Sequence, residues 1–313
     1  MSRAGFIGLI GRPNVGKSTL LNQLLGEKIA IATPRPQTTR NRILGVKNVP
    51  DGQLVLVDTP GLHRPSGKGR TKLNAFMVGE ALAALEQVDA LVLLVECPLP
   101  AEAVKGFRLE TADQFVLDEL KRVGKPAILA LNKVDLLHDK RLLLPQLQGW
   151  TQAYNFAAVV PISAKSADGV AALEAEMVKL LPEGAAIYPE EMITDRAERW
   201  LGAEFIREQV FILTKQEIPY SVAVTIDEWE ERAAEGKRAA DVVVSATVHV
   251  EKEAQKKIVV GQAGRMVREI GTRARQEISN LLGCPVHLKL FVRVDEGWTS
   301  NPAVLKDLGY ERE

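Results

Sequence analysis

Short apolar runs alternate with amphipathic stretches along the first 181 residues. The apolar runs lie at 6–10, 54–57, 90–95, 127–131 and 158–160, and the stretches at 72–85, 113–123 and 170–181 carry apolar residues at helical spacing. Runs of this length predict buried strands, and helical spacing predicts helices that bury one face. Their alternation is typical of a mostly parallel sheet with helices on both faces. We therefore expect an α/β domain over residues 1–181.

The pattern changes after residue 181. Turn formers and acidic residues between 182 and 195 break the alternation, and we expect a linker there. A helix at about 195–213, strands at 221–226 and 242–250, two helices around residues 261–264 and a last strand at 286–294 follow, and residues 228–237 are expected as a charged hairpin loop. The strands alternate in polarity, which predicts one buried and one exposed face. This order predicts a small α+β domain over residues 196–313.

Length and composition narrow the class of protein. At about 150 residues per domain, 313 residues correspond to two domains. Lysine plus arginine number 40, as do aspartate plus glutamate, so net charge identifies no class of partner. Cys97 and Cys284 lie far apart, which argues against a disulfide framework or a zinc site. With no signal-peptide pattern and no apolar run near the ~20 residues of a membrane span, we expect a cytoplasmic protein whose membrane contacts are at most peripheral.

Residues 11–18 carry the pattern GxxxxGK[ST] directly after an expected strand and before an expected helix. The glycines of such a P-loop permit a turn that wraps backbone N–H groups around phosphate oxygens, and the helix N-terminus adds favourable partial charge. Lys17 would bridge the β- and γ-phosphates, and the hydroxyl of Ser18 would bind Mg²⁺, which prefers oxygen ligands. The expected nucleotide-binding residues here are Gly11, Arg12, Pro13, Asn14, Val15, Gly16, Lys17, Ser18 and Thr19.

Two further motifs follow expected strands at the same edge of the sheet, and a shorter one follows the last strand. The first is Asp58-Thr59-Pro60-Gly61. Its Asp58 carboxylate would hold Mg²⁺ through water, and its Gly61 amide would contact the γ-phosphate. In Asn132-Lys133-Val134-Asp135, the carboxylate can accept from guanine N1–H and the N2 amine, two donors that adenine lacks. Ser163-Ala164-Lys165 supplies an amide for guanine O6. These motifs predict GTP and GDP as ligands.

In this order and spacing, the motifs resemble those of the Era family of GTPases. The resemblance rests on Asn14, on Gln37-Thr38-Thr39-Arg40 and on Leu62-His63 after the DTPG motif, and it covers essentially the whole chain. It implies that Thr39 is the switch threonine whose hydroxyl reaches Mg²⁺ in the GTP state, with Thr38 as the alternative. The expected catalytic residues are Lys17, Thr39 and Gly61, and the expected Mg²⁺ ligands are Ser18, Thr39 and Asp58.

Leu62 stands where Ras-like enzymes carry a glutamine that orients the attacking water. An aliphatic side chain cannot orient water. Similar GTPases bind K⁺ at the position of Asn14, and this cation would help neutralise the transition state. Asn14 either serves that role or satisfies backbone groups of the loop, and the sequence leaves both readings open.

Positive charge gathers around residues 261–264. Between residues 251 and 293, nine lysines and arginines face four acidic residues. Gly261-Gln262-Ala263-Gly264 between two helices resembles the GXXG clamp of a KH domain, whose glycines let a nucleic-acid backbone approach closely. The order of elements around it resembles the type II KH domain at the C-terminus of the Era family. The expected RNA contacts are Lys257, Gly261, Gln262, Ala263, Gly264, Arg265 and Arg268.

Two features of this region leave alternatives open. Similar loops often carry a lysine between the glycines, where this chain has Gln262 and Ala263, so Lys257 and Arg265 are expected to supply the charge. Phe291 points away from the expected core face. It either offers a base a stacking surface or packs under a neighbouring helix.

The sequence predicts a P-loop GTPase domain followed by a type II KH domain, in which GTP hydrolysis controls the binding of single-stranded RNA. The expected ligands are GTP, GDP and Mg²⁺. K⁺ is a further ligand if Asn14 holds a cation. The resemblance implies the 3′ end of 16S ribosomal RNA as target during assembly of the small ribosomal subunit. We expect a monomer in the cytoplasm or at the inner membrane's cytoplasmic face. Two alternatives remain: an RNA-binding adaptor with structural GTP, and a membrane-surface GTPase acting on a protein partner.

Overall fold

The computed structural model describes residues 2–33, 35, 38–63, 71–214, 218, 221–235 and 239–310. Gln37, on which the resemblance partly rests, lies outside them. The chain divides into two compact units, the first made of residues 1–69 and 77–195 and the second of residues 70–76 and 196–313. Within the described residues, no helix has the length and apolar character needed to cross a membrane.

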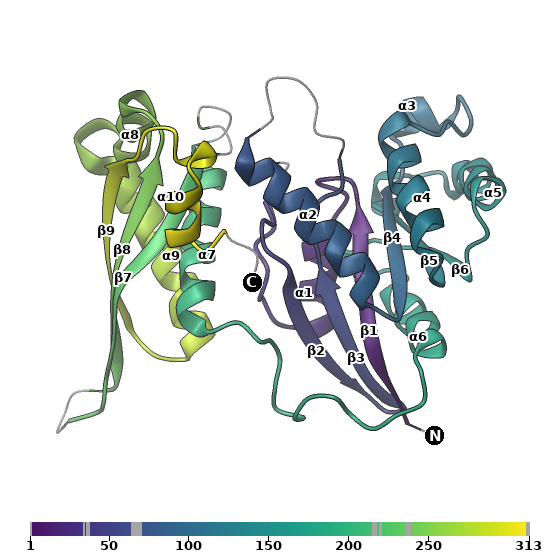
Figure 1. Cartoon of the computed structure of the whole chain (residues 1–313), viewed down its shortest axis with the longest axis horizontal. Helices are drawn as coiled ribbons and strands as arrows, with labels where there is room; N and C mark the ends of the chain where they lie inside the picture. Colours follow the sequence, from purple (N-terminus) through teal and green to yellow (C-terminus); the bar gives the residue numbers. More distant parts are fainter. Residues whose placement is uncertain are drawn as a thin grey trace. The chain divides into compact units, whose positions relative to one another are not determined.

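A six-stranded sheet forms the centre of the first unit (Figure 1). The strands lie in the order β2-β3-β1-β4-β5-β6, and all neighbours are parallel except β2 and β3. Their bounds are β1 (Arg3–Gly11), β2 (Ile43–Val49), β3 (Gly52–Asp58), β4 (Ala90–Glu96), β5 (Ala127–Asn132) and β6 (Ala158–Pro161). The apolar pattern predicts all of these except β2. That strand mixes polar and apolar residues, because it is the edge strand of the sheet, with β3 as its neighbouring strand.

Helices cover both faces of this sheet. They are α1 (Lys17–Leu25), α2 (Lys72–Gln87), the short α3 (Pro100–Ala103), α4 (Thr111–Val123), α5 (Leu143–Ala153) and α6 (Val170–Leu180). Leu91 and Leu93 of β4 share a core cluster with residues of α2, α4 and α5, such as Leu85 and Leu120. The intervening Val92 is buried on the opposite face, where α1 and α6 contact the sheet. The expected α/β class is confirmed.

Residues 182–195, expected as a linker, run along β2 and β3 inside the first unit. The carbonyl oxygen of Ile193 accepts from the N–H of Val46 at 2.7 Å. Further along β3, Gln53 Oε1 accepts from the N–H groups of residues 187 and 188 at 2.8 and 2.9 Å. These bonds satisfy backbone groups that a free linker would leave to water.

The second unit contains a three-stranded sheet in the order β7-β8-β9 (Figure 1). Its elements are α7 (Glu198–Leu213), β7 (Val222–Arg232), β8 (Asp241–Val250), α8 (Glu253–Val260), α9 (Arg265–Leu282), β9 (Val286–Val294) and α10 (Pro302–Asp307). β7 pairs antiparallel with β8, and β9 pairs parallel with β8. Val244 and Val248 of β8 are fully buried, as are Ile270 and Ala274 of α9, so one face of the sheet carries the core. The expected α+β class is confirmed.

The expectation of a charged hairpin loop at 228–237 is wrong in its first half. β7 continues to Arg232, past a register shift between Ile226 and Glu228. Glu228 accepts a hydrogen bond from Ser245 Oγ at 3.1 Å across the strand pair. Strands tolerate charged residues on a face that stays in water, so a charged run does not by itself end a strand.

Candidate nucleotide site and candidate RNA clamp

The loop after β1 has the backbone conformation that its sequence pattern requires. Gly16 has a φ of 102°, and a Cβ added there would lie 2.3 Å from Asn132 Nδ2. Gly11 is also confined, because a Cβ at this position would lie 2.3 Å from the carbonyl oxygen of Leu94. α1 begins directly after Gly16, at Lys17, so its first N–H groups lack partners within the helix. The loop thus places backbone donors at a helix N-terminus, an arrangement that suits phosphate.

Side chains from α1, β3 and the segment before β2 converge beside this loop. Ser18 Oγ donates to Asp58 Oδ2 at 2.6 Å and lies 2.8 Å from Thr39 Oγ1. Thr39 Oγ1 itself lies 3.3 Å from the same carboxylate oxygen. The other oxygen, Asp58 Oδ1, is buried and has no hydrogen-bond partner among the described residues. Lys17 Nζ donates to the carbonyl oxygen of Arg12 at 3.0 Å.

Burial dominates the electrostatics of this group. Desolvation lowers the pKa of Lys17 to about 8, and the charge of Asp58 only partly opposes this. Desolvation also raises the pKa of Asp58, against the opposing effects of the Lys17 charge and of hydrogen bonds from Ser18 and Thr39. Charged groups that have lost their water gain most from a counter-charge placed beside them. The arrangement therefore suits an anion beside Lys17 and a cation beside Asp58.

The two neighbouring threonines bond to different groups. Thr38 Oγ1 donates to the carbonyl oxygen of Arg35 at 2.7 Å and lies 2.7 Å from Thr33 Oγ1, so it stabilises its own loop. Thr39 is the residue whose hydroxyl reaches Ser18 and the β3 carboxylate. The geometry favours Thr39 over Thr38 as the hydroxyl of the site.

The segment after β3 packs tightly against the P-loop. A Cβ on Gly61 would lie 2.6 Å from the backbone nitrogen of Pro13, so only glycine fits there without a shift. The N–H of Leu62 donates to the carbonyl oxygen of Gly11 at 3.0 Å. The Leu62 side chain is fully buried in the core cluster shared with α2 and β4. It anchors the segment and does not enter the cavity.

The remaining motifs meet at the carboxyl ends of β5 and β6. Asn132 Nδ2 donates to the carbonyl oxygen of Val15 at 2.7 Å, and its Oδ1 accepts from the N–H of Ala164 at 2.9 Å. One amide side chain therefore ties the P-loop to the motif after β6. Lys133 has a φ of 67° and pairs with Glu96 at 2.9 Å. Asp135 lies in the short 3₁₀ turn Val134–Leu136.

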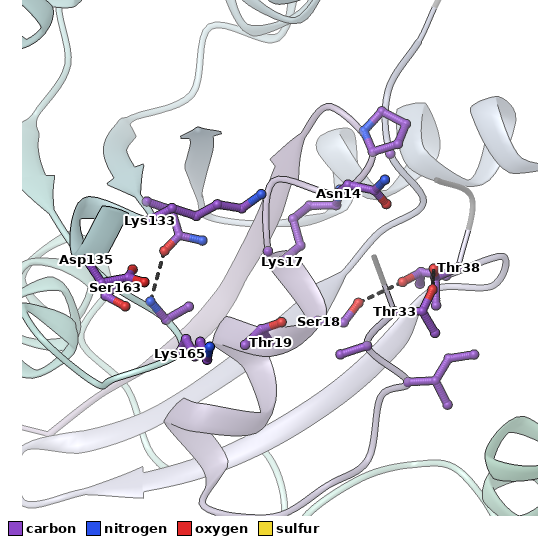
Figure 2. A pocket seen from close by; sticks show the side chains of 18 of the residues that line it. Asn14, Lys17, Ser18, Thr19, Thr33, Thr38, Lys133, Asp135, Ser163 and Lys165 are labelled. Carbon is purple, nitrogen blue, oxygen red and sulfur yellow. Dashed lines mark hydrogen bonds between the residues drawn. The ribbon is translucent and has the colours of Figure 1, made fainter. Parts of the chain in front are cut away.

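These segments surround a cavity of about 560 Å³ (Figure 2). Lys133, Asp135, Ser163 and Lys165 lie toward one end, and Asn14, Lys17, Ser18, Thr33 and Thr38 toward the other. The other expected residues on its wall are Pro13, Gly16, Thr19, Thr39, Gly61, Asn132 and Ala164. Ile31, Ala32, Thr33 and Leu136 also line it and were not predicted. They carry no motif, and only the path of the chain after α1 brings the first three to the wall.

Arg12, expected among the nucleotide-binding residues, directs its side chain away from this cavity. Its Nε lies 3.0 Å from Asp113 Oδ1 in the first turn of α4, and its guanidinium also pairs with Glu110. Desolvation raises the pKa of Asp113 to about 6, against the opposing charge of Arg12. Only the backbone of Arg12, through its bond from Lys17, belongs to the phosphate end.

The glycine pair of the second unit lies between α8 and α9. Gly261 has φ 70° and ψ 175°, and a Cβ there would lie 2.6 Å from Met266 Cβ. Ala263 and Gly264 also have positive φ, of 50° and 74°. The exposed residues around the turn are Lys257, Gln262, Ala263, Arg265 and Arg268. The loop therefore presents backbone and positive charge together, as a phosphate clamp requires.

Comparison with known proteins identifies families for both units. Residues 6–133 match the family of 50S ribosome-binding GTPases, and residues 217–299 match the KH domain family. The chain is 44% identical to GTPase Era of Geobacter sp. strain M21 over 309 residues, which is 99% of this chain and 98% of that protein. It is 45% identical to GTPase Era of Syntrophus aciditrophicus over 310 residues, 99% of this chain and 96% of that protein.

Two solved structures share the fold over the whole length. One is a variant of Aquifex aeolicus Era bound to GDP·AlF4⁻, with a TM-score of 0.90, 36% identity and coverage of 99% of this chain and 100% of the other. The second is Era in complex with MgGDPNP and nucleotides 1506–1542 of 16S ribosomal RNA, with a TM-score of 0.90, 36% identity and full coverage of both chains. The resemblance seen in the sequence is thereby confirmed: the chain belongs to the Era family, as a GTPase with a C-terminal KH domain.

Proposed function

We propose that this GTPase binds GTP with Mg²⁺ in the cavity of the first unit and controls RNA binding by the second. The cavity supports the proposal, because residues from five separate segments converge there with the donors and acceptors that a guanine nucleotide needs. The relative solved with MgGDPNP has the same fold over its full length. We assign residues 1–181 to the GTPase domain and residues 196–313 to the KH domain, and residues 182–195, which bond along β2 and β3, to the segment that links the two domains.

The nucleotide would lie with its phosphates at the P-loop and its base at the far end of the cavity. Lys17 would neutralise charge on the β- and γ-phosphates, and backbone N–H groups of residues 14–18 would donate to phosphate oxygens. At the other end, the carboxylate of Asp135 would accept from the two guanine donors, and a backbone amide of the Ser163-Ala164-Lys165 motif would donate to O6. Lys133 and Ser163 frame this pocket.

The residues around Asp58 fit a magnesium ion. Two hydroxyl oxygens, of Ser18 and Thr39, gather within 3.3 Å of one carboxylate oxygen, and the second carboxylate oxygen is buried without a hydrogen bond among the described residues. Hard oxygen donors of this kind are those that Mg²⁺ prefers. The ion would supply positive charge at the phosphates during hydrolysis.

Hydrolysis in this site would depend on positioning and charge, since Leu62 is buried and cannot orient water. The Gly61 amide, held against the P-loop, would contact the γ-phosphate and lose that contact after hydrolysis. Asn14, on the wall at the phosphate end, is our candidate for holding K⁺.

The metal assignment is tested by separating the two threonines. Thr39→Ala removes a hydroxyl beside Asp58, so we expect a weaker preference for GTP·Mg²⁺ over GDP·Mg²⁺ and at least about tenfold slower hydrolysis. Thr38→Ala serves as the matched control, because its hydroxyl contacts Thr33 and the carbonyl oxygen of Arg35, whereas the Thr39 hydroxyl contacts Asp58, and hydrolysis should stay within about threefold. Nucleotide affinity and multiple-turnover phosphate release are the measurements. A larger loss in Thr38→Ala would move the switch role to Thr38.

For the second unit, we propose single-stranded RNA from the 3′ end of 16S ribosomal RNA as the ligand. The support is the solved relative, whose RNA is nucleotides 1506–1542, together with the exposed clamp and its basic neighbours Lys257, Arg265 and Arg268. The protein would act on the assembling small ribosomal subunit as a cytoplasmic monomer with peripheral contact to the inner membrane.

Crosslinking in living cells tests the target. Ultraviolet crosslinking followed by RNA sequencing should recover the 3′ end of 16S ribosomal RNA with this protein. Recovery of no RNA, together with binding to anionic vesicles, would favour a GTPase that acts at the membrane surface.

A further inference from the structure

An exposed aromatic ring lies on the second unit's sheet, on the face opposite the core. Leu290 of β9 faces α9, where a Cβ on Gly271 would lie 3.4 Å from its Cδ1. Strand geometry turns the neighbouring residue Phe291 to the other face. Phe291 is 58% exposed, so α8 and α9, which contact β9, leave its ring uncovered. Of the two alternatives drawn from the sequence, this exposure argues against the one in which the ring packs under a neighbouring helix.

Charge is divided across this outer face. β9 carries His287, Lys289 and Arg293 on either side of the ring, and we call these residues with Phe291 the β9 stripe. The register places Lys289 beside Ser245 and Phe291 beside Thr247 of β8, and beyond them lie the acidic residues of β7. An anion would therefore be attracted along β9 and repelled from β7.

Hydrogen bonds from β8, the middle strand, hold the acidic side chains of β7. Thr247 Oγ1 donates to Asp227 Oδ2 at 2.7 Å, and Ser245 Oγ donates to Glu228 Oε2 at 3.1 Å. The β9 stripe has its own partners at its ends: His287 lies 3.2 Å from Asp241, and Arg293 Nε donates to Asp295 at 2.8 Å. Lys289, next to the ring, is exposed.

We propose that the β9 stripe is a second RNA contact, in which Phe291 stacks on a base outside the GXXG clamp and Lys289 neutralises an adjacent phosphate. The inference rests on the proposed RNA-binding function and extends it to a separate surface. Alternate residues on a strand are about 7 Å apart, so a base on the ring has basic groups on both sides along the strand. An exposed ring flanked by positive charge is the pattern by which proteins hold single-stranded nucleic acid without reading its sequence.

The test uses the full chain and a synthetic RNA of nucleotides 1506–1542 of 16S ribosomal RNA. Phe291→Ala should weaken binding about tenfold, because one stacked base is lost. Phe291→Leu should weaken it as much, since a leucine is apolar but has no π-face, and Phe291→Tyr should bind like the wild type. Lys289→Ala should reduce the slope of log affinity against log salt concentration by about one unit, because one phosphate contact is lost. Glu230→Ala, on the acidic side of the same face, is the matched control and should not weaken binding.

A second readout locates the contact. RNA carrying 5-iodouridine should crosslink to a peptide that contains Phe291, and this crosslink should disappear in Phe291→Ala. Circular dichroism melts and GTP hydrolysis of each variant show that its fold is intact.

The outcomes separate this inference from the proposed function. If Phe291→Ala binds the RNA with wild-type affinity while a variant of the GXXG clamp loses affinity, the β9 stripe does not contact RNA. The clamp would then remain the RNA contact. Retained affinity in both variants would overturn RNA binding by the whole unit. Full affinity in Phe291→Leu would exclude stacking, because an apolar contact would then be sufficient.

Discussion

Asp135 is expected to select guanine through hydrogen bonds to the base. It lies in the 3₁₀ turn after β5 on the cavity wall, at the end opposite Lys17 (Figure 2). The P-loop lysine and Asp58, by contrast, are buried and lose hydration, so their charges depend on what occupies the cavity. Base selection and phosphate binding therefore rely on different physical effects at the two ends of one site.

Asp135→Asn should change the preferred base. An amide can donate to the O2 of xanthine, whereas it cannot accept from both guanine donors, so we expect GTP affinity to fall by about a hundredfold and XTP affinity to rise. Competition binding with GTP, XTP and ATP measures this. Unchanged GTP affinity without any gain for XTP would contradict the role given to Asp135.

Asn14 is the basis of a prediction about monovalent cations. Hydrolysis should be slow and should accelerate when Na⁺ is replaced by K⁺ at constant ionic strength, because Leu62 is buried and K⁺ would add charge at the transition state. In Asn14→Ala the two cations should give equal rates. If this variant keeps full K⁺ activation, Asn14 does not hold the cation.

The P-loop is tied to a helix as well as to the sheet. Arg12 pairs with Glu110 and Asp113 at the start of α4, and Leu62, one residue beyond the DTPG motif, donates to Gly11. These contacts join the loop to two elements that are far apart in the sequence. A rigid loop loses less entropy when it binds a nucleotide than a mobile one.

The pair of Arg12 and Asp113 should therefore act as one unit. Arg12→Ala and Asp113→Asn should each weaken GTP binding by roughly three- to tenfold, because either change removes the ion pair of Arg12 with Asp113 that helps to hold the loop against α4. The double variant should bind GTP no more weakly than Arg12→Ala, since Arg12→Ala already removes the ion pair with Asp113. Calorimetric titration of the four proteins completes the cycle, and additive losses would show that the two residues act separately.

Nucleotide binding and RNA binding use residues of different units, which should be separable by mutation. Substituting Gly261 is a poor test, because a Cβ there would meet Met266 at 2.6 Å. Gln262 and Ala263 are exposed, and Ala263 already has a φ of 50°, a conformation that aspartate and asparagine tolerate better than most residues. These two positions therefore allow charge to be changed with little change of backbone.

Gln262→Asp combined with Ala263→Asp should weaken RNA binding by at least about tenfold, because two negative charges would face the phosphates. Basal GTP hydrolysis should stay within about twofold. The matched control carries asparagine at both positions and should bind RNA like the wild type. Loss of GTP hydrolysis in the aspartate variant alone would show that the two units are not independent.

Local spacing was sufficient to predict most of the fold and most of the candidate nucleotide site. Strand and helix periods depend on neighbouring residues, and each loop motif lies directly after a strand, so five strands of the first sheet and the order of the second unit follow from pattern alone. The edge strand β2 was missed, because a strand at the edge of a sheet need not be apolar throughout.

Other features needed contacts between residues far apart in the chain. Thr38 and Thr39 are equivalent in the sequence, and only the approach of β3 shows which hydroxyl meets Asp58. Arg12 belongs to the P-loop motif, yet acids about a hundred residues away take its side chain. Alternation places Phe291 on the outer face of β9, but its exposure depends on where every helix packs, which no local pattern contains.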